Sequence, residues 1–123
     1  MEKLATSKKI PPTATIAFLQ MLGLAARARK LGIGASIARD AIRAKKAQCV
    51  VLAIDASDNT QKRITDSASF YDTPLYVLEE RADRLGHALG KKGTVAAVAV
   101  LDASFASALQ GIYEKFTEDL LEV

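Results

Sequence analysis

The feature that most restricts the fold is an unbroken apolar segment in the middle of the chain. Residues 48–54 read Gln-Cys-Val-Val-Leu-Ala-Ile, without alternation between polar and apolar side chains. Such a β-branched run is typical of a strand that is buried on both faces, as in the centre of an α/β sheet. Residues 94–101 form a second run of small apolar side chains. The sequence therefore predicts a sheet with helices on both sides.

Helical and strand patterns alternate along the rest of the chain. Short strands are predicted at 31–33 and at 75–78, the second after Pro74, because the residue before a proline is pushed out of helical geometry. Helices with one apolar stripe are predicted at about 13–29, 34–46, 59–71, 80–90 and from 103 onward. This alternation predicts an α/β fold, a three-layer α/β/α sandwich around a small, mostly four-stranded mixed sheet.

The length of 123 residues suits one domain with its own core. Residues 1–12 are a polar stretch ending in two prolines, and we expect a mobile leader there, followed by a single domain at 13–123. The start does not read as a secretory signal, because Gln20 interrupts its apolar segment and Arg27 stands where a cleavage region is uncharged. The single cysteine, Cys49, excludes an internal disulfide. We expect a cytoplasmic protein.

Charge is unevenly distributed along the chain, although the formal net charge is only +3. Residues 27–46 contain seven basic side chains and one acidic one. The C-terminal stretch 114–122 has the opposite balance, with four acidic side chains and one basic one. This asymmetry favours a surface that faces a polyanion, and the alternative interpretation is an ordinary solvated face.

Gly34 stands at the predicted start of the second helix, directly after a basic segment. Helix N-termini expose unpaired backbone N–H groups at the positive end of the helix dipole, and Arg29 and Lys30 precede this one in sequence. Residues 90–94, Gly-Lys-Lys-Gly-Thr, lead into the last strand. If both segments lie at the same edge of the sheet, two basic loops flank one anion site.

Other sites have weaker support in the sequence. Gly32 and Gly34 do not complete a dinucleotide fingerprint, because Ile37 stands in the place of the third glycine. A phosphoacceptor role for Asp55 needs an acidic pair after an N-terminal strand, which this sequence lacks, so a helix-capping turn is the better interpretation. His87 has no second histidine or cysteine at ligand spacing.

Cys49 is expected to act as a small buried apolar residue. With one cysteine, one histidine and no nucleophile–base pair, the sequence predicts a protein that is not an enzyme. It also predicts no cofactor and no metal. Lys45 and Lys46 follow the second helix and complement the C-terminal end of its dipole, so we place them outside the site.

Several motifs together resemble one known family over about residues 16–110. They are Leu22-Gly23-Leu24-Ala25, Ala28-Arg29-Lys30-Leu31, Gly34, the Val-Val-Leu-Ala run at 50–53 and Leu85-Gly86-His87-Ala88-Leu89-Gly90-Lys91. In this order they resemble the bacterial YlxQ-type proteins of the ribosomal protein L-seven-Ae / L-thirty-e superfamily. The resemblance implies a small α/β/α protein that binds kink-turn or related internal-loop RNA, often in a ribosomal or translational setting.

The resemblance also implies where RNA would bind. In archaeal and eukaryotic members, an Asn-Glu pair and a Lys at the start of the second helix read sheared G·A pairs. Here Ser36, Ile37 and Asp40 take those places, so this polar set is missing. We therefore expect recognition of shape and phosphates, because phosphate contacts position an RNA and base-edge contacts specify it.

The predicted RNA-binding residues are Arg29, Lys30, Gly34, Ala35, Ser36, Ile37, Lys91, Lys92, Gly93, Thr94 and Val95. The basic residues would neutralise phosphates, Gly93 would allow close approach, and Thr94 and Val95 would contact an unstacked base. The alternative is a protein–protein adaptor on the same fold. An exposed Ile37 would favour the adaptor, and an Ile37 buried beneath a positive surface would favour RNA. We expect a monomer whose partners are structured RNA, ribosomal RNA included, and other translation proteins.

Overall fold

A computed structural model describes residues 7–121, and side chains for residues 7–117. Five strands form one mixed sheet in the order β1-β4-β3-β5-β2. They are β1 Ser7–Lys9, β2 Leu31–Ile33, β3 Cys49–Ala53, β4 Leu75–Leu78 and β5 Ala97–Val100. Strands β1, β4 and β3 are parallel, and β5 pairs antiparallel with both β3 and β2.

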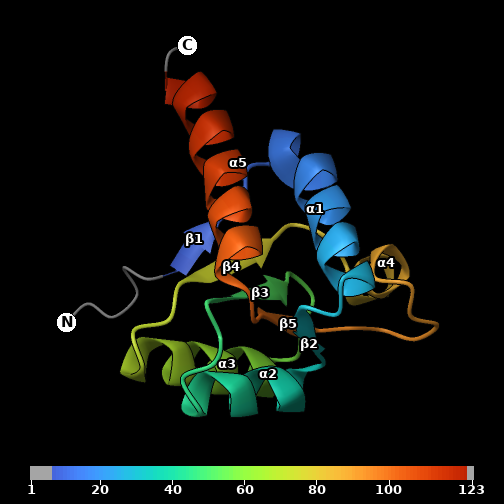
Figure 1. Cartoon of the computed structure of the whole chain (residues 1–123), viewed down its shortest axis with the longest axis vertical. Helices are drawn as coiled ribbons and strands as arrows, with labels where there is room; N and C mark the ends of the chain where they lie inside the picture. The colour runs from blue at the N-terminus through green and yellow to red at the C-terminus, as the bar shows by residue number, and fades with distance from the viewer. Residues whose placement is uncertain (1–6, 122–123) are drawn as a thin grey trace.

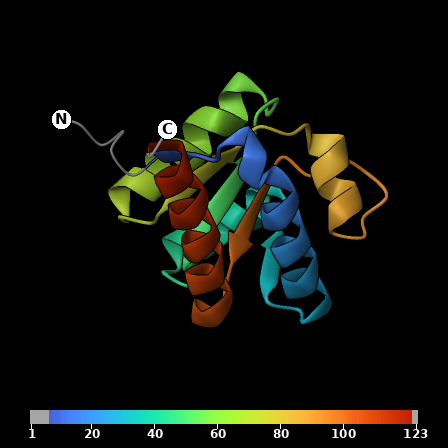
Figure 2. The same ribbon diagram turned by 90° about the horizontal axis from the view of Figure 1, so that it is seen from above.

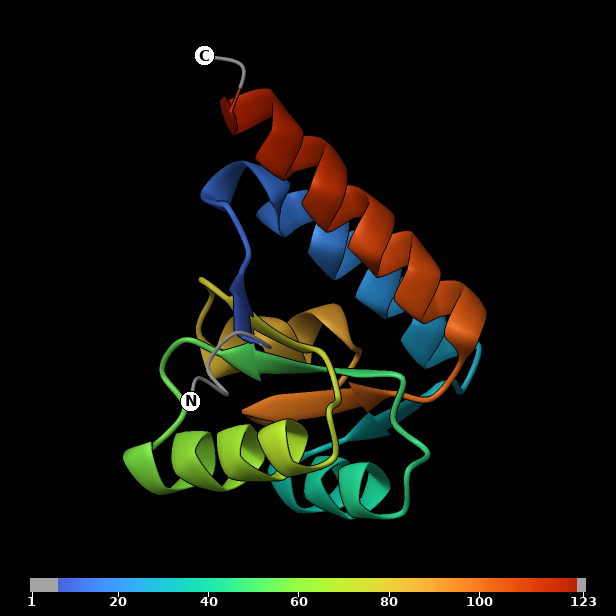
Figure 3. The same ribbon diagram turned by 90° about the vertical axis from the view of Figure 1, so that its left-hand side faces the viewer.

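Helices cover both faces of this sheet. They are α1 Thr15–Arg27, α2 Ala35–Arg43, α3 Asp58–Phe70, α4 Ala82–Ala88 and α5 Ala103–Leu121, with a 3-10 turn, η2, at Pro12–Ala14. Figure 3 shows α2 and α3 on one face and α1, α4 and α5 on the other. In Figure 1, α1 and α5 stand side by side above the sheet, and the two helices contact each other. The predicted α/β class and layering are confirmed.

The predicted count of four strands is wrong, because β1 adds a fifth. It forms from residues 7–9 of the stretch expected to be a leader, whereas residues 1–6 lie outside the described part of the chain. Ser-Lys-Lys has no apolar periodicity, so only its pairing with β4 makes it a strand. Ile10 secures this edge: its side chain is buried and its N–H donates to the Val77 carbonyl oxygen at 2.9 Å. The start of the single domain at residue 13 stays a prediction.

Strand β3 has the two-sided burial that its sequence predicts. Cys49, Val51 and Ala53 belong to the core cluster that includes side chains of α1, α4 and α5. Val50 and Leu52 belong to the cluster that includes side chains of α2 and α3. All five are buried, so the absence of alternation in this segment correctly indicated a central strand.

The larger of the two clusters also holds the most strongly shifted titratable groups. The Cys49 side chain is 2% exposed, and burial raises the pKa of its thiol to about 12. Burial, and then the neighbouring Cys49, raise the pKa of Tyr76 to about 12. The Tyr76 ring lies edge-on to Phe18 and Tyr113, with centroids 5.3 and 5.7 Å away. Cys49 is thus a protonated core residue, as expected.

Candidate functional site

The start of α2 and the loop before β5 meet at one edge of the sheet, which we call the rim. Strands β2, β3 and β4 end there and β5 begins there, because β5 runs antiparallel to β2 and β3. The Gly34 N–H donates to the Ala97 carbonyl oxygen at 2.9 Å, and the Ala53 N–H donates to the Ala96 carbonyl oxygen at 2.8 Å. The end of β2 is therefore paired with the start of β5, the strand that the second predicted loop leads into.

The rim end of α2 has free backbone donors. Gly34, with φ 113° and ψ 147°, turns the chain from β2 into α2 in a conformation that other residues rarely adopt. The N–H groups of Ala35, Ser36 and Ile37 precede the first intrahelical hydrogen bond, from Ala38 to Gly34 at 2.8 Å. Among the described residues, the backbone N–H groups that donate to a side chain are those of Thr60, Arg81, Ala82 and Phe105, and none of these lies in α2. Unpaired donors at the positive end of a helix favour an anion.

The other two helices that begin at the rim have side-chain caps. The Ser57 hydroxyl accepts a hydrogen bond from the Thr60 N–H of α3 at 3.1 Å. Asp55 Oδ1 accepts one from the Ala82 N–H of α4 at 2.8 Å. The capping role expected for Asp55 is confirmed, but the helix that it caps is α4, which begins far along the chain.

The loop between α4 and β5 lies closely against α4. Gly90, with φ 77°, ends the helix in the left-handed conformation that its sequence predicted. A Cβ on Gly86 would collide with the Gly93 carbonyl oxygen, so this helical glycine allows the loop to approach. The Val95 N–H then donates to the Ala82 carbonyl oxygen at 3.0 Å. These contacts hold the loop in place before β5.

Four of the five predicted contact residues of this loop are accessible. Lys91, Lys92, Gly93 and Thr94 are exposed. Val95 is 5% exposed and packs in the core cluster beside α4. The expected contact between Val95 and an unstacked base is therefore wrong, because its side chain faces the core. Thr94 remains as the side chain next to it that a ligand can reach.

Arg29 and Lys30 do not lie beside Gly34. The Lys30 carbonyl oxygen accepts a hydrogen bond from the Leu101 N–H at 2.8 Å, beyond the C-terminal end of β5. Figure 2 shows the turn after α1 near the start of α5, at the opposite end of β5 from the α4–β5 loop. An extended three-residue strand such as β2 spans about 10 Å. Their placement at the start of α2 is wrong, because the residues between them and Gly34 are extended.

Ser36 and Ile37 are exposed at the rim, and Ala35 is half-buried. The Ile37 side chain is 55% exposed. The buried part of the Ile37 side chain packs over Gly32. Ile37 Cγ2 lies 3.1 Å from the position that a Cβ on Gly32 would take. This exposure favours a protein–protein adaptor, because an apolar side chain at the surface suits contact with another protein.

Charge divides the rim into two halves. The β2–β5 half has the uncapped start of α2 and the two loop lysines. The β3–β4 half has Asp55, Glu79 and Glu80, and its Arg81 guanidinium is paired with Asp83 at 3.0 Å. An anionic ligand is therefore favoured at the β2–β5 half.

Sequence reasoning missed Gly86 and two arginines near the rim. Gly86 belongs to the motif at 85–91 and lies inside a helical pattern, but neither signal indicated that it supports the following loop. Arg39 and Arg63 line a cavity between α2 and α3, which no motif indicated. His87 is exposed on α4, and no metal-binding group of His, Cys, Asp and Glu occurs among the described side chains, residues 7–117. None of the described helices combines the length and apolar composition that crossing a membrane requires.

Comparison with known proteins assigns the family. Residues 17–110 match the model of the ribosomal protein L7Ae/L30e/S12e/Gadd45 family. The chain belongs to this family. It is 44% identical over 89 residues to the RNA-binding protein YlxQ of Bacillus subtilis (strain 168), covering 72% of this chain and 87% of that protein. It is 35% identical over 104 residues to the RNA-binding protein YlxQ of Enterococcus faecium, covering 85% and 90%. The resemblance to YlxQ-type proteins is thereby confirmed.

Two solved structures have the same fold as this chain. A Bacillus halodurans C protein of unknown function superposes with a TM-score of 0.71 and 35% identity, covering 79% of this chain and 96% of that one. The Giardia lamblia 15.5kD RNA binding protein superposes with a TM-score of 0.71 and 16% identity, covering 85% and 88%. At that low identity the second match shows only that the L7Ae-type fold is shared.

Proposed function

We propose that this family member binds structured RNA, of the kink-turn or a related internal-loop type, through the β2–β5 half of the rim. The observation that carries the proposal is the pairing of Gly34, at the uncapped start of α2, with Ala97 at the start of β5, the strand that follows the loop of Lys91 and Lys92. Backbone donors and lysines both suit phosphate oxygens. The names of the two YlxQ relatives, both RNA-binding proteins, support the same ligand.

The exposed side chains favour recognition of shape over sequence. Ser36, Ile37 and Asp40 are all exposed, and they stand in the places of the Asn-Glu pair and the Lys that the resemblance implies for reading base edges in other members. We propose that the backbone N–H groups of α2 bind one phosphate while Lys91 and Lys92 neutralise others. Such binding is strongly salt-dependent, because each neutralised phosphate releases counterions.

The proposed setting follows from the same features. We propose a monomer that acts in the cytoplasm, beside ribosomal RNA and other translation proteins. Its action is binding without catalysis. The protonated, buried Cys49 thiol supports this, because the thiolate is the nucleophilic form of cysteine.

The test compares a labelled kink-turn RNA with a plain duplex of equal length, at about 50 and about 200 mM salt. We expect tighter binding to the kink-turn and a loss of affinity at the higher salt concentration. Equal, weak binding to both RNAs would overturn kink-turn recognition.

A protein–protein adaptor is the second candidate function, and the 55% exposure of Ile37 favours it. An adaptor would keep its protein partners after nuclease treatment of a cell extract, and Ile37→Ser would release them. Release of every partner by nuclease would exclude this function, and an Ile37→Ser variant with unchanged partners would exclude Ile37 as the contact.

A further inference from the structure

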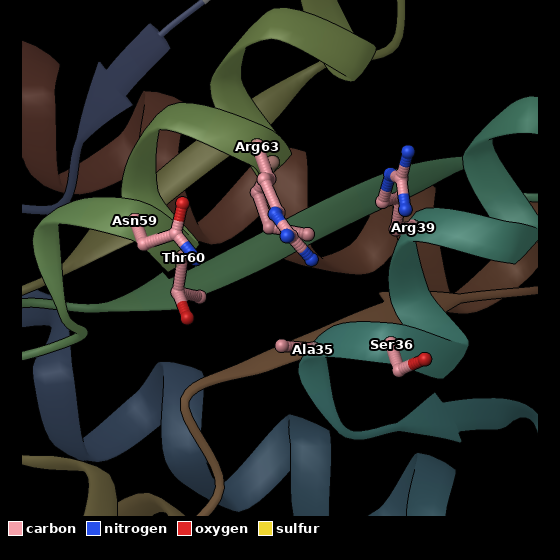
Figure 4. A pocket seen from close by; sticks show the side chains of 7 residues that line it. Ala35, Ser36, Arg39, Asn59, Thr60 and Arg63 are labelled. Carbon is pink, nitrogen blue, oxygen red and sulfur yellow. The ribbon is translucent and has the colours of Figure 1, made fainter.

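A cavity with both polar and apolar lining lies next to the rim, between the N-terminal halves of α2 and α3. Ser36 and Arg39 line it from α2, and Asn59, Thr60 and Arg63 line it from α3. Figure 4 shows Arg39 and Arg63 along one side of this cavity and Ser36 on the opposite side. Its volume is about 180 Å³. This is below the roughly 300–1,000 Å³ of pockets for drug-sized ligands, so the cavity suits a small group.

The two arginines give the cavity an uncompensated positive charge. Neither guanidinium has an ion pair or side-chain hydrogen bond among the side chains of residues 7–117. Asp40 and Asp58, on the same two helices, do not line the cavity, and Asp66 is held by a lysine at 3.0 Å. Two unpaired cations in one cavity repel each other. An anion bound between them attracts both, and this attraction offsets the repulsion.

The remaining polar groups supply donors. The Thr60 hydroxyl accepts a hydrogen bond from the Ser57 hydroxyl at 3.0 Å, which leaves its own proton free to donate. Ser36 contributes a second exposed hydroxyl and Asn59 an amide. Guanidinium groups present planar, paired donors that match phosphate oxygens. The set of donors therefore fits a tetrahedral oxyanion.

The cavity is continuous with the rim. Ser36 belongs to both, since it lies in the uncapped first turn of α2 and lines the cavity. Arg39 follows it by three residues, a rise of about 4.5 Å along the helix. We propose that the Arg39–Arg63 cavity binds a backbone phosphate of the RNA at the rim, and so extends the interface across α2 and α3. This inference rests on the proposed RNA-binding function.

The test uses the full chain and one kink-turn RNA, titrated over a series of salt concentrations. The variant is the double substitution Arg39→Gln and Arg63→Gln. The expected result is an affinity about tenfold lower, with the slope of log affinity against log salt reduced by roughly 0.7–0.9 for the lost phosphate. Its melting temperature should not fall, because the substitutions remove a repulsion between two cations, the half-buried Arg39 and the exposed Arg63.

The matched control is Lys45→Gln with Lys46→Gln, which removes the same charge beyond the other end of α2 and should leave the slope unchanged. Arg39→Lys with Arg63→Lys should keep the slope and lose part of the affinity, because lysine lacks the planar fork. Equal behaviour of the Arg39→Gln/Arg63→Gln variant and the control would overturn the cavity as a phosphate site while RNA binding at the rim stands. No preference of the unmodified protein for kink-turn RNA over duplex would instead overturn the proposed function, and this inference with it.

Discussion

In the β3–β4 half of the rim, Ser57 and Asp55 occupy the first-turn donors of α3 and α4. In the β2–β5 half, no described side chain accepts a hydrogen bond from the first-turn N–H groups of α2. The same sheet edge is thus closed on one side by its own side chains and left open on the other. A side-chain cap typically stabilises a protein by about 1 kcal/mol, so α2 forgoes stability that the other two helices have.

The two halves also differ in the residues that shape their surfaces. At the open half, Gly34 directs the chain into α2 and Gly86 admits the loop that displays Lys91 and Lys92. At the closed half, carboxylates and an ion pair occupy the surface. A ligand that accepts hydrogen bonds from helix N–H groups is favoured only where no side chain already accepts them. Substitutions in the open half should therefore change RNA affinity, and those in the closed half should not.

Reversing the charge of the open half should have the largest effect. Lys91→Glu with Lys92→Glu should weaken kink-turn binding by more than about 100-fold, because charged hydrogen bonds contribute roughly 1.5–3 kcal/mol each and repulsion replaces them. Titration of labelled RNA should also show a smaller salt slope. The control, Lys45→Glu with Lys46→Glu, carries the same charge change beyond the far end of α2. An equal loss in the control would mean that net charge, and not the rim, controls affinity.

Gly86→Ala should break the support of the loop. Its Cβ meets the Gly93 carbonyl oxygen, a backbone atom that a rotamer change cannot move. We expect the free energy of unfolding to fall by about 2–3 kcal/mol, measured by urea denaturation. Gly111→Ala is the comparison within α5, because no atom lies within 4 Å of its Cβ position, and it should raise stability by up to about 1 kcal/mol. Similar behaviour of the two variants would contradict the described packing.

Gly34→Ala should destabilise the turn into α2. At φ 113° and ψ 147° the backbone is close to a region that glycine almost alone occupies, so we expect a loss of about 1–2 kcal/mol in the free energy of unfolding. Gly93→Ala provides the contrast, since Gly93 has no positive φ and open space around its Cβ position. Thermal melts of both variants decide the matter: a neutral Gly34→Ala would show that this turn is not constrained.

The smallest effect is expected at the closed half. Asp55→Ala removes the hydrogen bond to the Ala82 N–H and should lower the free energy of unfolding by about 1 kcal/mol, without weakening RNA binding. Glu79→Ala, at an exposed site next to it, should change stability by less than about 0.5 kcal/mol. A loss of RNA affinity in Asp55→Ala would show that the closed half takes part in binding.

Local patterns predicted most of the elements correctly. Residues 48–54 indicated a central strand because burial on both faces removes the polar positions that an exposed face would need. Gly90 was predicted in its left-handed conformation because helix ends commonly require it. By contrast, β1 has a polar edge-strand sequence, and only its backbone pairing with β4 defines it.

The site was predicted less completely than the fold. The sequence left open whether the Gly34 segment and the 90–94 loop lie at the same edge, and the strand directions place the end of β2 and the start of β5 at one edge. The roles of Gly34, Ser36 and the two loop lysines in RNA binding stay predictions. Arg29 and Lys30 were misplaced because adjacency in sequence does not survive an intervening strand. Val95 was wrongly predicted to contact RNA. Thr94 is exposed, but the Val95 side chain points the other way, into the core beside α4.

The sequence by itself determined the family, the α/β layering and the glycine that begins α2, since each depends on residues within one or a few turns of the chain. Only the tertiary structure decided which helix Asp55 caps, that Gly86 supports the α4–β5 loop, and that Arg39 and Arg63 line one cavity. These depend on segments far apart in sequence that meet when both faces of the sheet are covered. No local sequence pattern predicts these long-range contacts, because they form only when the whole chain buries its two hydrophobic cores.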